Sequence, residues 1–265
     1  MTDPSPRTAD ANGRFWGARA RDWAEVQERQ FAAGYDDVLA RTGVGPGTRL
    51  LDAGCGAGMA AARAAALGAI VAGIDAAPLL LDIARERVPA GDFRTGDLED
   101  LPFPDGAFDV VTGFNAFQFA GNPIQALTEA RRVTRPGGLV AVMTWGRPEG
   151  MEAASVVAAL RPLLPPPPPG APGPFALSDP DRLSAFVAQA GMGPREVIEG
   201  ETHWTYPDLA TALRGLNSSG VAIRAAGLAG EAAVSAAHAA ALEPFRQPDG
   251  SFRIGARYMA VIATA

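Results

Sequence analysis

Apolar strand-like runs alternate with helix-like segments between residues 49 and 145, and this alternation restricts the fold more than any other feature. The runs are continuously apolar, as in strands that are covered on both faces. Strands joined by crossover helices form a parallel sheet. The pattern therefore predicts an α/β fold with a doubly wound, Rossmann-like sheet. The five strands expected here cover residues 49–54, 69–75, 92–97, 108–117 and 138–145.

Further elements are expected on both sides of this region. Apolar residues at helical spacings predict two N-terminal helices, broken near Gly34. A later strand is expected near residues 194–204, and an Ala-rich helical stretch precedes a final strand. The expected segments are a disordered N-terminus (1–13), N-terminal helices (14–42), a ligand-binding core (43–147), a helix and Pro-rich linker (148–178), a core helix and strand (179–206), a helical cap (207–245) and the final strand (246–265).

A run of five prolines, residues 165–169, interrupts the helical pattern of the linker. Consecutive prolines favour a stiff polyproline II segment, which cannot be a helix or a central strand. We interpret the run as a surface linker. A ligand for a proline-binding module is the alternative.

Composition and charge exclude several classes of function. The net charge of −6 and the lack of a basic cluster argue against nucleic acid as a partner. No apolar run approaches the ~20 residues that span a bilayer, and the first residues lack a signal peptide's apolar segment, so a cytoplasmic protein is expected. Cys55 is the single cysteine, which excludes an internal disulfide and a cysteine-based metal site. All basic residues are Arg, so a lysine Schiff base is excluded.

A glycine-rich stretch, LLDAGCGAGMA (residues 50–60), joins the first expected strand to its helix. Glycines without a Cβ let the backbone turn tightly and approach a ligand, beyond the carboxyl ends of the strands. The dinucleotide loop G-x-G-x-x-G would require glycine at position 59, where this chain has Met59. A P-loop requires a lysine after its glycines, and the chain has none. The stretch therefore favours another nucleoside-bearing cofactor.

Two acidic residues follow the next strands. Asp75 ends the second expected strand, where a carboxylate can accept hydrogen bonds from both hydroxyls of a ribose. A purely structural role for Asp75, as an acid at the start of a helix, is the alternative. Asp97 follows the third strand. This spacing is compatible with an adenosine-bearing ligand.

The segments LLDAGCGAG, GID, GDLEDLPFPDGAFDVV and EARRVTRPGGLVAV together resemble the class I S-adenosylmethionine (SAM) dependent methyltransferases. They resemble most the small-molecule branch that includes the ubiquinone and menaquinone methyltransferases. The four segments occur in the family's order and spacing and cover about residues 49–145. The resemblance implies a seven-stranded, mostly parallel sheet with an antiparallel last strand and a helical cap inserted before it. It also implies SAM as cofactor and S-adenosyl-L-homocysteine as product.

The resemblance also implies roles for particular residues. The loop would lie along the methionine portion of SAM, the strand ends would bind ribose and adenine, and the end of the fourth strand would lie near the transferable methyl. The cofactor residues implied in this way are Asp52, Gly54, Gly56, Gly58, Asp75, Ala76, Asp97, Leu98, Phe114 and Asn115. The N-terminal helices would cover the cofactor, and Trp16 and Trp23 would line the cofactor or acceptor pocket; packing of both in the core is the alternative.

Methyl transfer requires alignment of the reacting atoms and exclusion of water, and it needs a general base only for an acceptor that holds its proton tightly. His203 is the candidate for such a base or for an acceptor contact, with Tyr206 beside it as a substrate-binding candidate. His238, flanked by alanines, is interpreted as packed or surface-exposed. The apolar cap suits a small-molecule acceptor.

We therefore predict a SAM-dependent methyltransferase acting on oxygen, nitrogen or carbon of a small molecule, in secondary metabolism. The alternative is an enzyme of the same fold that binds SAM but catalyses another reaction, such as a cyclisation. A nicotinamide-dependent oxidoreductase is disfavoured by Met59, and a scaffold that presents the proline run is a third hypothesis. No metal, nucleic acid or membrane partner is expected, and a homodimer is left open.

Overall fold

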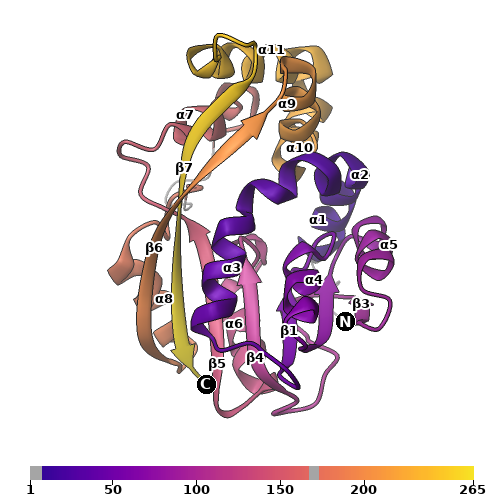
Figure 1. The fold of residues 1–265 in the computed structure, drawn as a ribbon, viewed down its shortest axis with the longest axis vertical. Coiled ribbons are helices and arrows are strands. Elements are labelled where there is room, and N and C mark those ends of the chain that lie inside the picture. Colours follow the sequence, from indigo (N-terminus) through magenta and orange to yellow (C-terminus); the bar gives the residue numbers. More distant parts are fainter. Residues whose placement is uncertain (1–7, 167–172) are drawn as a thin grey trace, which may run out of the picture.

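The computed structural model describes residues 8–166 and 173–265 and contains a seven-stranded sheet in the order β3-β2-β1-β4-β5-β7-β6 (Figure 1). Strands β1 to β5 are parallel, and β7 runs antiparallel to both of its neighbours. The expected seven-stranded, mostly parallel sheet with an antiparallel last strand is confirmed. The strands are β1 (Arg49–Ala53), β2 (Ile70–Asp75), β3 (Asp92–Thr95), β4 (Phe108–Phe114), β5 (Thr134–Trp145), β6 (Gly193–Tyr206) and β7 (Phe252–Thr264).

Helices cover both faces of the sheet, which explains the continuously apolar strands. On β4, Val110 packs with α3, α4 and α5, whereas the next residue, Val111, packs with α6 and α8 on the opposite face. Successive strand residues point to opposite faces, so both must be apolar in a sheet that is covered twice. The covering helices are α3 (Ala32–Arg41), α4 (Met59–Ala66), α5 (Pro78–Arg87), α6 (Pro123–Val133) and α8 (Pro180–Gln189).

Local signals account for where several of these helices begin. Proline occupies the first turn of α5, α6 and α8, where its missing N–H is not needed. The Asn122 side chain accepts a hydrogen bond from the Gln125 amide at the start of α6, and Asp179 caps α8 in the same way. These signals are readable from the sequence.

The N-terminal segment differs from the sequence prediction in two respects. The helix α1 (Thr8–Gly17) begins inside the region expected to be disordered, so that expectation is wrong for residues 8–13; residues 1–7 lie outside the described part. The helix break lies before Gly34, in α2 (Ala20–Asp22), the π-helical turn η1 (Trp23–Gln27) and the 3-10 turn η2 (Glu28–Phe31). Gly34 itself lies within α3, where a Cβ would come within 2.6 Å of the Met143 sulfur. Its role is close packing on β5 rather than helix breaking.

The predicted helical cap is confirmed between β6 and β7, as α9 (Leu209–Leu216), α10 (Gly220–Ala229), α11 (Glu231–Leu242) and the turn η5 (Glu243–Phe245). Pairing of β6 with β7 continues as far as Tyr206 and Phe252, so this hairpin extends past the rest of the sheet and carries the cap at its end (Figure 1). The cap packs on the N-terminal segment: Gly215 lies against Val26, and Gly220 lies against the Trp16 indole. The cap therefore connects the β6 and β7 edge of the sheet to the N-terminal helices.

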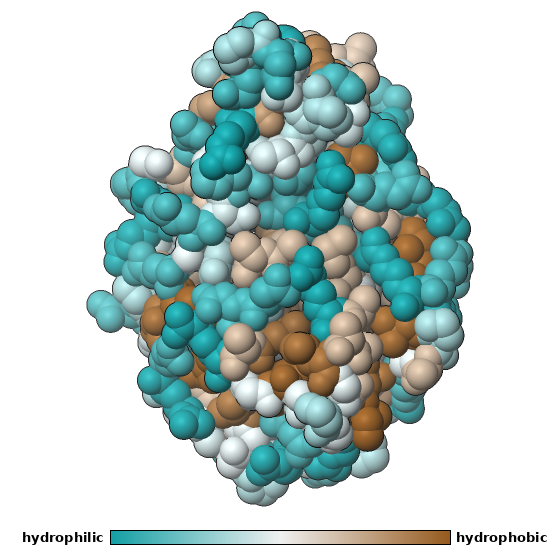
Figure 2. Space-filling model, viewed as in Figure 1, coloured by the Kyte–Doolittle hydropathy of each residue, from teal (hydrophilic) through white to brown (hydrophobic). Residues whose placement is uncertain are grey.

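The linker before α8 is less helical than predicted, with the short helix α7 (Ala153–Ala158) and the turn η4 (Arg161–Leu163). Of the proline run, Pro165 and Pro166 are described, and residues 167–169 lie outside the described part, so its predicted conformation is untested. Figure 2 shows hydrophilic side chains around the cap and hydrophobic side chains gathered lower in the view. Within residues 8–166 and 173–265, no helix has the length and apolar character needed to cross a membrane.

Candidate functional site

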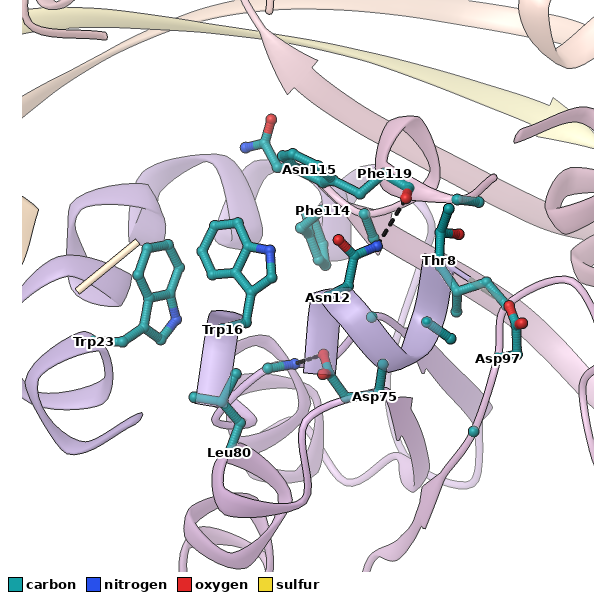
Figure 3. Close-up of a pocket in the computed structure, with 18 of the residues that line it drawn as sticks. Thr8, Asn12, Trp16, Trp23, Asp75, Leu80, Asp97, Phe114, Asn115 and Phe119 are labelled. Carbon is teal, nitrogen blue, oxygen red and sulfur yellow. Dashed lines mark hydrogen bonds between the residues drawn. The ribbon is translucent and has the colours of Figure 1, made fainter. Parts of the chain in front are cut away.

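A cavity of about 160 Å³ lies beyond the carboxyl ends of the strands (Figure 3). Residues following β1, β2, β3, β4 and β5 line it on one side, and N-terminal residues line it on the other. Its wall comprises Thr8, Ala9, Asn12, Trp16, Trp23, Phe31, Tyr35, Gly54, Gly56, Asp75, Ala76, Leu80, Gly96, Asp97, Leu98, Phe114, Asn115, Ala116, Phe119, Ala120 and Trp145.

The glycine loop contributes Gly54 and Gly56 to this wall. Gly54 has φ +75°, and a Cβ there would lie 2.5 Å from the Ala116 Cβ, so no larger residue fits. Gly56 also has positive φ, at +54°. Gly58 lies behind the cavity wall, and a Cβ there would lie 2.7 Å from the Ala84 Cβ of α5. The first two glycines therefore shape the cavity, whereas Gly58 lets α4 and α5 pack closely.

Asp75 closes the end of β2 with both carboxylate oxygens held by the backbone. Its Oδ2 accepts a hydrogen bond from the Gly56 amide at 2.8 Å, and its Oδ1 accepts one from the Ala77 amide at 2.9 Å. Burial raises the pKa of Asp75, and these backbone hydrogen bonds lower it. Each oxygen still has a lone pair for a ligand donor. Ala76 lies beside it, where Gly13 of α1 packs directly on the Ala76 carbonyl.

Asp52 is not part of the cavity wall, although the sequence comparison suggested a ligand contact. Its side chain is buried and accepts a hydrogen bond from the Thr112 hydroxyl at 3.1 Å. Burial raises the pKa of Asp52 to about 7; the hydrogen bond from Thr112 lowers it, and the charges of Glu28 and Asp75 raise it further. The structure therefore places Asp52 behind the wall, and its direct contact with a ligand stays a prediction. The strand alternation turns this carboxyl toward β4 and behind the glycine loop.

Glu28 is a site-supporting residue that sequence reasoning missed. It is buried in η2, accepts a hydrogen bond from the Met59 amide at 3.2 Å and forms an ion pair with Arg87 of α5. Arg87 also donates to the carbonyls of Ala24 and Ala57, each at 2.8 Å. Burial raises the pKa of Glu28, and Arg87 opposes this. The pair joins the N-terminal segment, the glycine loop and α5. Because its two residues are far apart in the sequence, no local sequence pattern predicts that they meet.

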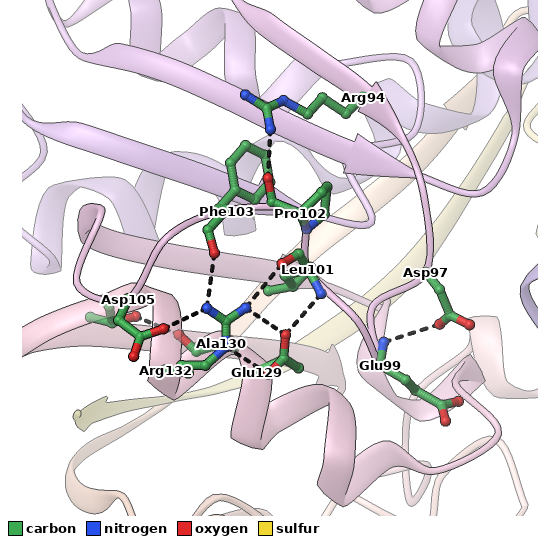
Figure 4. Close-up of polar contacts among 11 residues, drawn as sticks. Arg94, Asp97, Glu99, Leu101, Pro102, Phe103, Asp105, Glu129, Ala130 and Arg132 are labelled. Carbon is green, nitrogen blue, oxygen red and sulfur yellow. Dashed lines mark hydrogen bonds and ion pairs between the residues drawn. The ribbon is translucent and has the colours of Figure 1, made fainter.

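Asp97 and Leu98 both line the cavity, on a loop held by a polar network (Figure 4). The Asp97 carboxylate accepts a hydrogen bond from the Glu99 amide at 3.0 Å. Farther along, Glu129 of α6 accepts from the Leu101 amide at 2.9 Å, and Arg132 donates to the Leu101 carbonyl at 2.9 Å. These bonds fix the loop and hence the two residues that the sequence singled out.

Phe114 and Asn115 lie at the end of β4, and both line the cavity; their place near the methyl group of the cofactor stays a prediction. Asn115 has φ +50°, and its backbone amide donates a hydrogen bond to the Met143 carbonyl at 2.8 Å. Its Oδ1 accepts a hydrogen bond from Gln118 Nε2 at 3.2 Å. Positive φ is uncommon for a residue with a side chain, but asparagine adopts it more readily than most.

The predicted residues Trp16 and Trp23 both line the cavity (Figure 3). Their rings meet edge to face with centroids 4.9 Å apart, and Trp16 lies 5.6 Å from Phe119 in a similar geometry. Asn12 Nδ2 donates to the Phe119 carbonyl at 2.8 Å and so joins α1 to the turn η3 (Phe117–Phe119). The N-terminal helices thus cover the cavity.

His203 and Tyr206 are not brought to this cavity, and the prediction that they lie at the site is wrong. Residues of β6 alternate, with Trp204 and Tyr206 buried and His203 exposed. The Tyr206 hydroxyl donates to Gln27 Oε1 at 2.8 Å within the core. The period of two along the strand explains why neighbours in sequence point apart. His238 is buried against Asn217, which agrees with the packed interpretation.

The similarity of this chain to known proteins includes the part that forms the strand side of the cavity. A family model described as a methyltransferase domain matches residues 51–142. A ubiquinone biosynthesis O-methyltransferase of Cereibacter sphaeroides is 34% identical over 172 residues, 62% of this chain and 68% of that protein. A malonyl-acyl-carrier-protein O-methyltransferase of Serratia marcescens is 41% identical over 99 residues, 37% of this chain and 39% of that protein. The chain thus spans about two fifths to two thirds of these relatives.

Solved structures share the fold. The cyclase SpnF has a TM-score of 0.61 at 21% identity, covering 100% of this chain and 98% of that one. A SAM dependent methyltransferase from Aquifex aeolicus has a TM-score of 0.52 at 18% identity, covering 68% of this chain and 91% of that one. At such identities the likeness concerns the fold alone.

Proposed function

Because this chain belongs to the class I SAM-dependent methyltransferases, a family of enzymes whose cofactor is SAM, we propose that it transfers a methyl group to oxygen, nitrogen or carbon of a small-molecule acceptor. Secondary metabolism is the proposed setting. The observation that carries the proposal is Asp75, whose two carboxylate oxygens are held by backbone amides beside a glycine loop that lacks Cβ atoms. A ribose diol fits this arrangement.

The residues of the cavity fit SAM. In the proposed binding mode Gly54 and Gly56 lie along its methionine portion, and Asp75 accepts hydrogen bonds from the ribose hydroxyls. Asp97 accepts from the adenine amino group. Flanking contacts to the adenine and the methyl come from Ala76, Leu98, Phe114 and Asn115. The buried Asp52 and Gly58 support the loop from behind, which follows from their positions outside the cavity wall.

When bound, SAM supplies a methyl group activated by a positively charged sulfur. The chain's own contribution is alignment and exclusion of water, which can account for much of the barrier reduction in such a displacement. Trp16 and Trp23 cover the cavity from the N-terminal side, and Asn115 offers an amide beside the acceptor space. His203 has no part in this mechanism because it is exposed and away from the cavity.

A non-methylating reaction such as cyclisation is the alternative. A cyclase shares the fold, so the fold by itself does not distinguish group transfer from ring closure. The two relatives described above are O-methyltransferases by name, which favours methyl transfer.

The proposal is tested with SAM that carries an isotopic label in its methyl group, incubated with the protein and a library of small hydroxylated, amino and carboxylic acceptors. We expect label in at least one product together with S-adenosyl-L-homocysteine. Conversion of an acceptor without label would favour the cyclase alternative. Calorimetric binding of NAD but not of S-adenosyl-L-homocysteine would refute the cofactor assignment.

A further inference from the structure

One side of the cavity is formed by four aromatic side chains: Phe31, Tyr35, Phe114 and Trp145. We name the part of the cavity beside these four rings the acceptor chamber. Tyr35 meets Phe114 edge to face at 4.7 Å between centroids, and it stacks on Phe31 at 6.5 Å. Phe31 in turn lies 5.4 Å from Trp145. The rings support one another, so the chamber is a preorganised apolar space suited to a flat ring system.

The sheet order separates this chamber from the proposed cofactor site. The glycine loop and Asp75 follow β1 and β2, whereas Phe114 and Trp145 end β4 and β5 on the other side of β1. Gly34, next to Tyr35, packs on Met143 of β5. Tyr35 therefore lies over the β4 and β5 half of the cavity, where an acceptor would meet the methyl group.

The chamber has two polar side-chain groups, the Tyr35 hydroxyl and the Trp145 indole N–H, and the hydroxyl is the one that can both donate and accept. The chain has three tyrosines, and two have hydroxyl partners: Tyr206 donates to Gln27 at 2.8 Å, and Tyr258 donates to Asp37 at 3.0 Å. The Tyr35 hydroxyl has no hydrogen-bond partner among residues 8–166 and 173–265.

The same hydroxyl is not sealed inside the protein. In the described part of the chain, the polar side-chain atoms that are both sealed and unpartnered are Gln118 Oε1 and Trp204 Nε1. The unpartnered Tyr35 oxygen is not among them, and Tyr35 lines the cavity, so we infer that a ligand in the cavity can reach this oxygen. Burial, followed by the charges of Glu28 and Asp52, raises the pKa of Tyr35 well above its usual value. The group therefore stays neutral and can donate a hydrogen bond.

We propose that the acceptor chamber binds a planar aromatic substrate bearing an ionisable hydroxyl group, and that Tyr35 donates a hydrogen bond to this oxygen, which is the atom methylated. The proposal rests on the proposed function and names its substrate class. A single donor on one lone pair of the oxygen leaves another lone pair free to attack, so Tyr35 orients the nucleophile. An aromatic hydroxyl that ionises near neutral pH needs no general base in the chamber.

The phenol loses its proton to solvent and enters the chamber as phenolate. Its oxygen lone pair forms a bond to the methyl carbon while the bond from that carbon to sulfur breaks, and the bonding pair stays on sulfur. A negative oxygen and a positive sulfur become a neutral ether and a neutral thioether. Because charge disappears in this step, an apolar chamber that excludes water favours it.

The test uses the full chain saturated with S-adenosyl-L-homocysteine and 2-hydroxyanthraquinone as probe, a flat phenol whose visible absorption changes on ionisation. We expect the protein to bind the probe, with the pKa of the bound hydroxyl lower in wild type than in a variant that lacks the Tyr35 donor. Tyr35→Phe keeps the ring and removes only the donor, so it should weaken binding of the phenolate about tenfold or more and raise the pKa of the bound probe. Anthraquinone, which lacks the hydroxyl, should bind wild type and variant equally.

Tyr258→Phe is the matched control, because it removes a tyrosine hydroxyl that faces Asp37 rather than the cavity. It should leave probe affinity and the bound pKa unchanged. The inference is overturned if wild type fails to bind the probe, if Tyr35→Phe binds the phenolate as tightly as wild type, or if that variant instead weakens S-adenosyl-L-homocysteine. Failure of wild type to bind S-adenosyl-L-homocysteine at all would overturn the proposed function instead.

Discussion

Replacing Arg87 with methionine should strongly destabilise the protein, because Arg87 neutralises a buried carboxylate. The Glu28 side chain is 4% exposed and Arg87 is 24% exposed, so their ion pair is well shielded from water. Removing one partner of a buried pair costs about 3–5 kcal/mol, because the remaining charge is left uncompensated. Protonation of Glu28 limits the cost. We therefore expect the free energy of unfolding to fall by about 3 kcal/mol at pH 7.5.

The loss of stability in Arg87→Met should become smaller as the pH falls. Burial already raises the pKa of Glu28 in the folded state above its usual value, and removing Arg87 removes the main opposing cause. A carboxyl whose folded pKa is raised destabilises the fold when charged, and this penalty disappears as the pH falls through the folded pKa. The deficit of Arg87→Met relative to wild type should therefore shrink between pH 7.5 and pH 5.5.

Urea denaturation followed by circular dichroism measures both effects. The double variant Glu28→Gln/Arg87→Met removes the stranded charge and should recover part of the loss at pH 7.5. Arg21→Met is the control: its pair with Glu86 is exposed, at 66% and 56%, and its removal should leave stability nearly unchanged. A loss for Arg87→Met no greater than that of Arg21→Met, or no recovery in the double variant, would refute the reasoning.

Three further predictions concern the site and the cap. Asp75→Asn should weaken binding of S-adenosyl-L-homocysteine by roughly 10- to 100-fold in calorimetry, since hydrogen bonds to a charged group are worth about 1.5–3 kcal/mol; unchanged affinity would remove Asp75 from the site. Gly54→Ala should lower stability by about 1–3 kcal/mol in urea denaturation, because its Cβ would lie 2.5 Å from that of Ala116 at φ +75°; wild-type stability would show that the loop can shift. Burial lowers the pKa of His238 to about 4, so its neutral form stabilises the fold above pH ~6.5 and this contribution is lost as the pH falls toward 4. His238→Gln should therefore flatten the acid side of the stability profile, and an unchanged profile would show that another group is responsible.

Much of the cofactor half of the site was predictable because its signals are local. Each strand of a doubly wound sheet ends at the same edge, so residues that follow successive strands, such as Gly54, Asp75 and Asp97, necessarily come together. Their identities and order along the chain were enough. The family resemblance predicted that Trp16 and Trp23 lie at the site, and both line the cavity.

Other parts depended on contacts between distant segments. Glu28 and Arg87 are 59 residues apart, and neither forms a local pattern that suggests burial. Tyr35 was missed because a tyrosine on a helix looks the same whether it faces a cavity or the core. His203 was misassigned because a single step along β6 decides between solvent and interior.

By itself, the sequence determined the parallel sheet, the glycine loop and the acidic residues at the strand ends, because alternation of apolar segments and turn chemistry act over short stretches of chain. The tertiary structure alone decided which side chains form the acceptor chamber. That space is enclosed where the N-terminal helices meet the ends of β4 and β5, and the side chains that face it depend on packing between segments about 80 to 110 residues apart. Tyr35 faces the cavity for this reason.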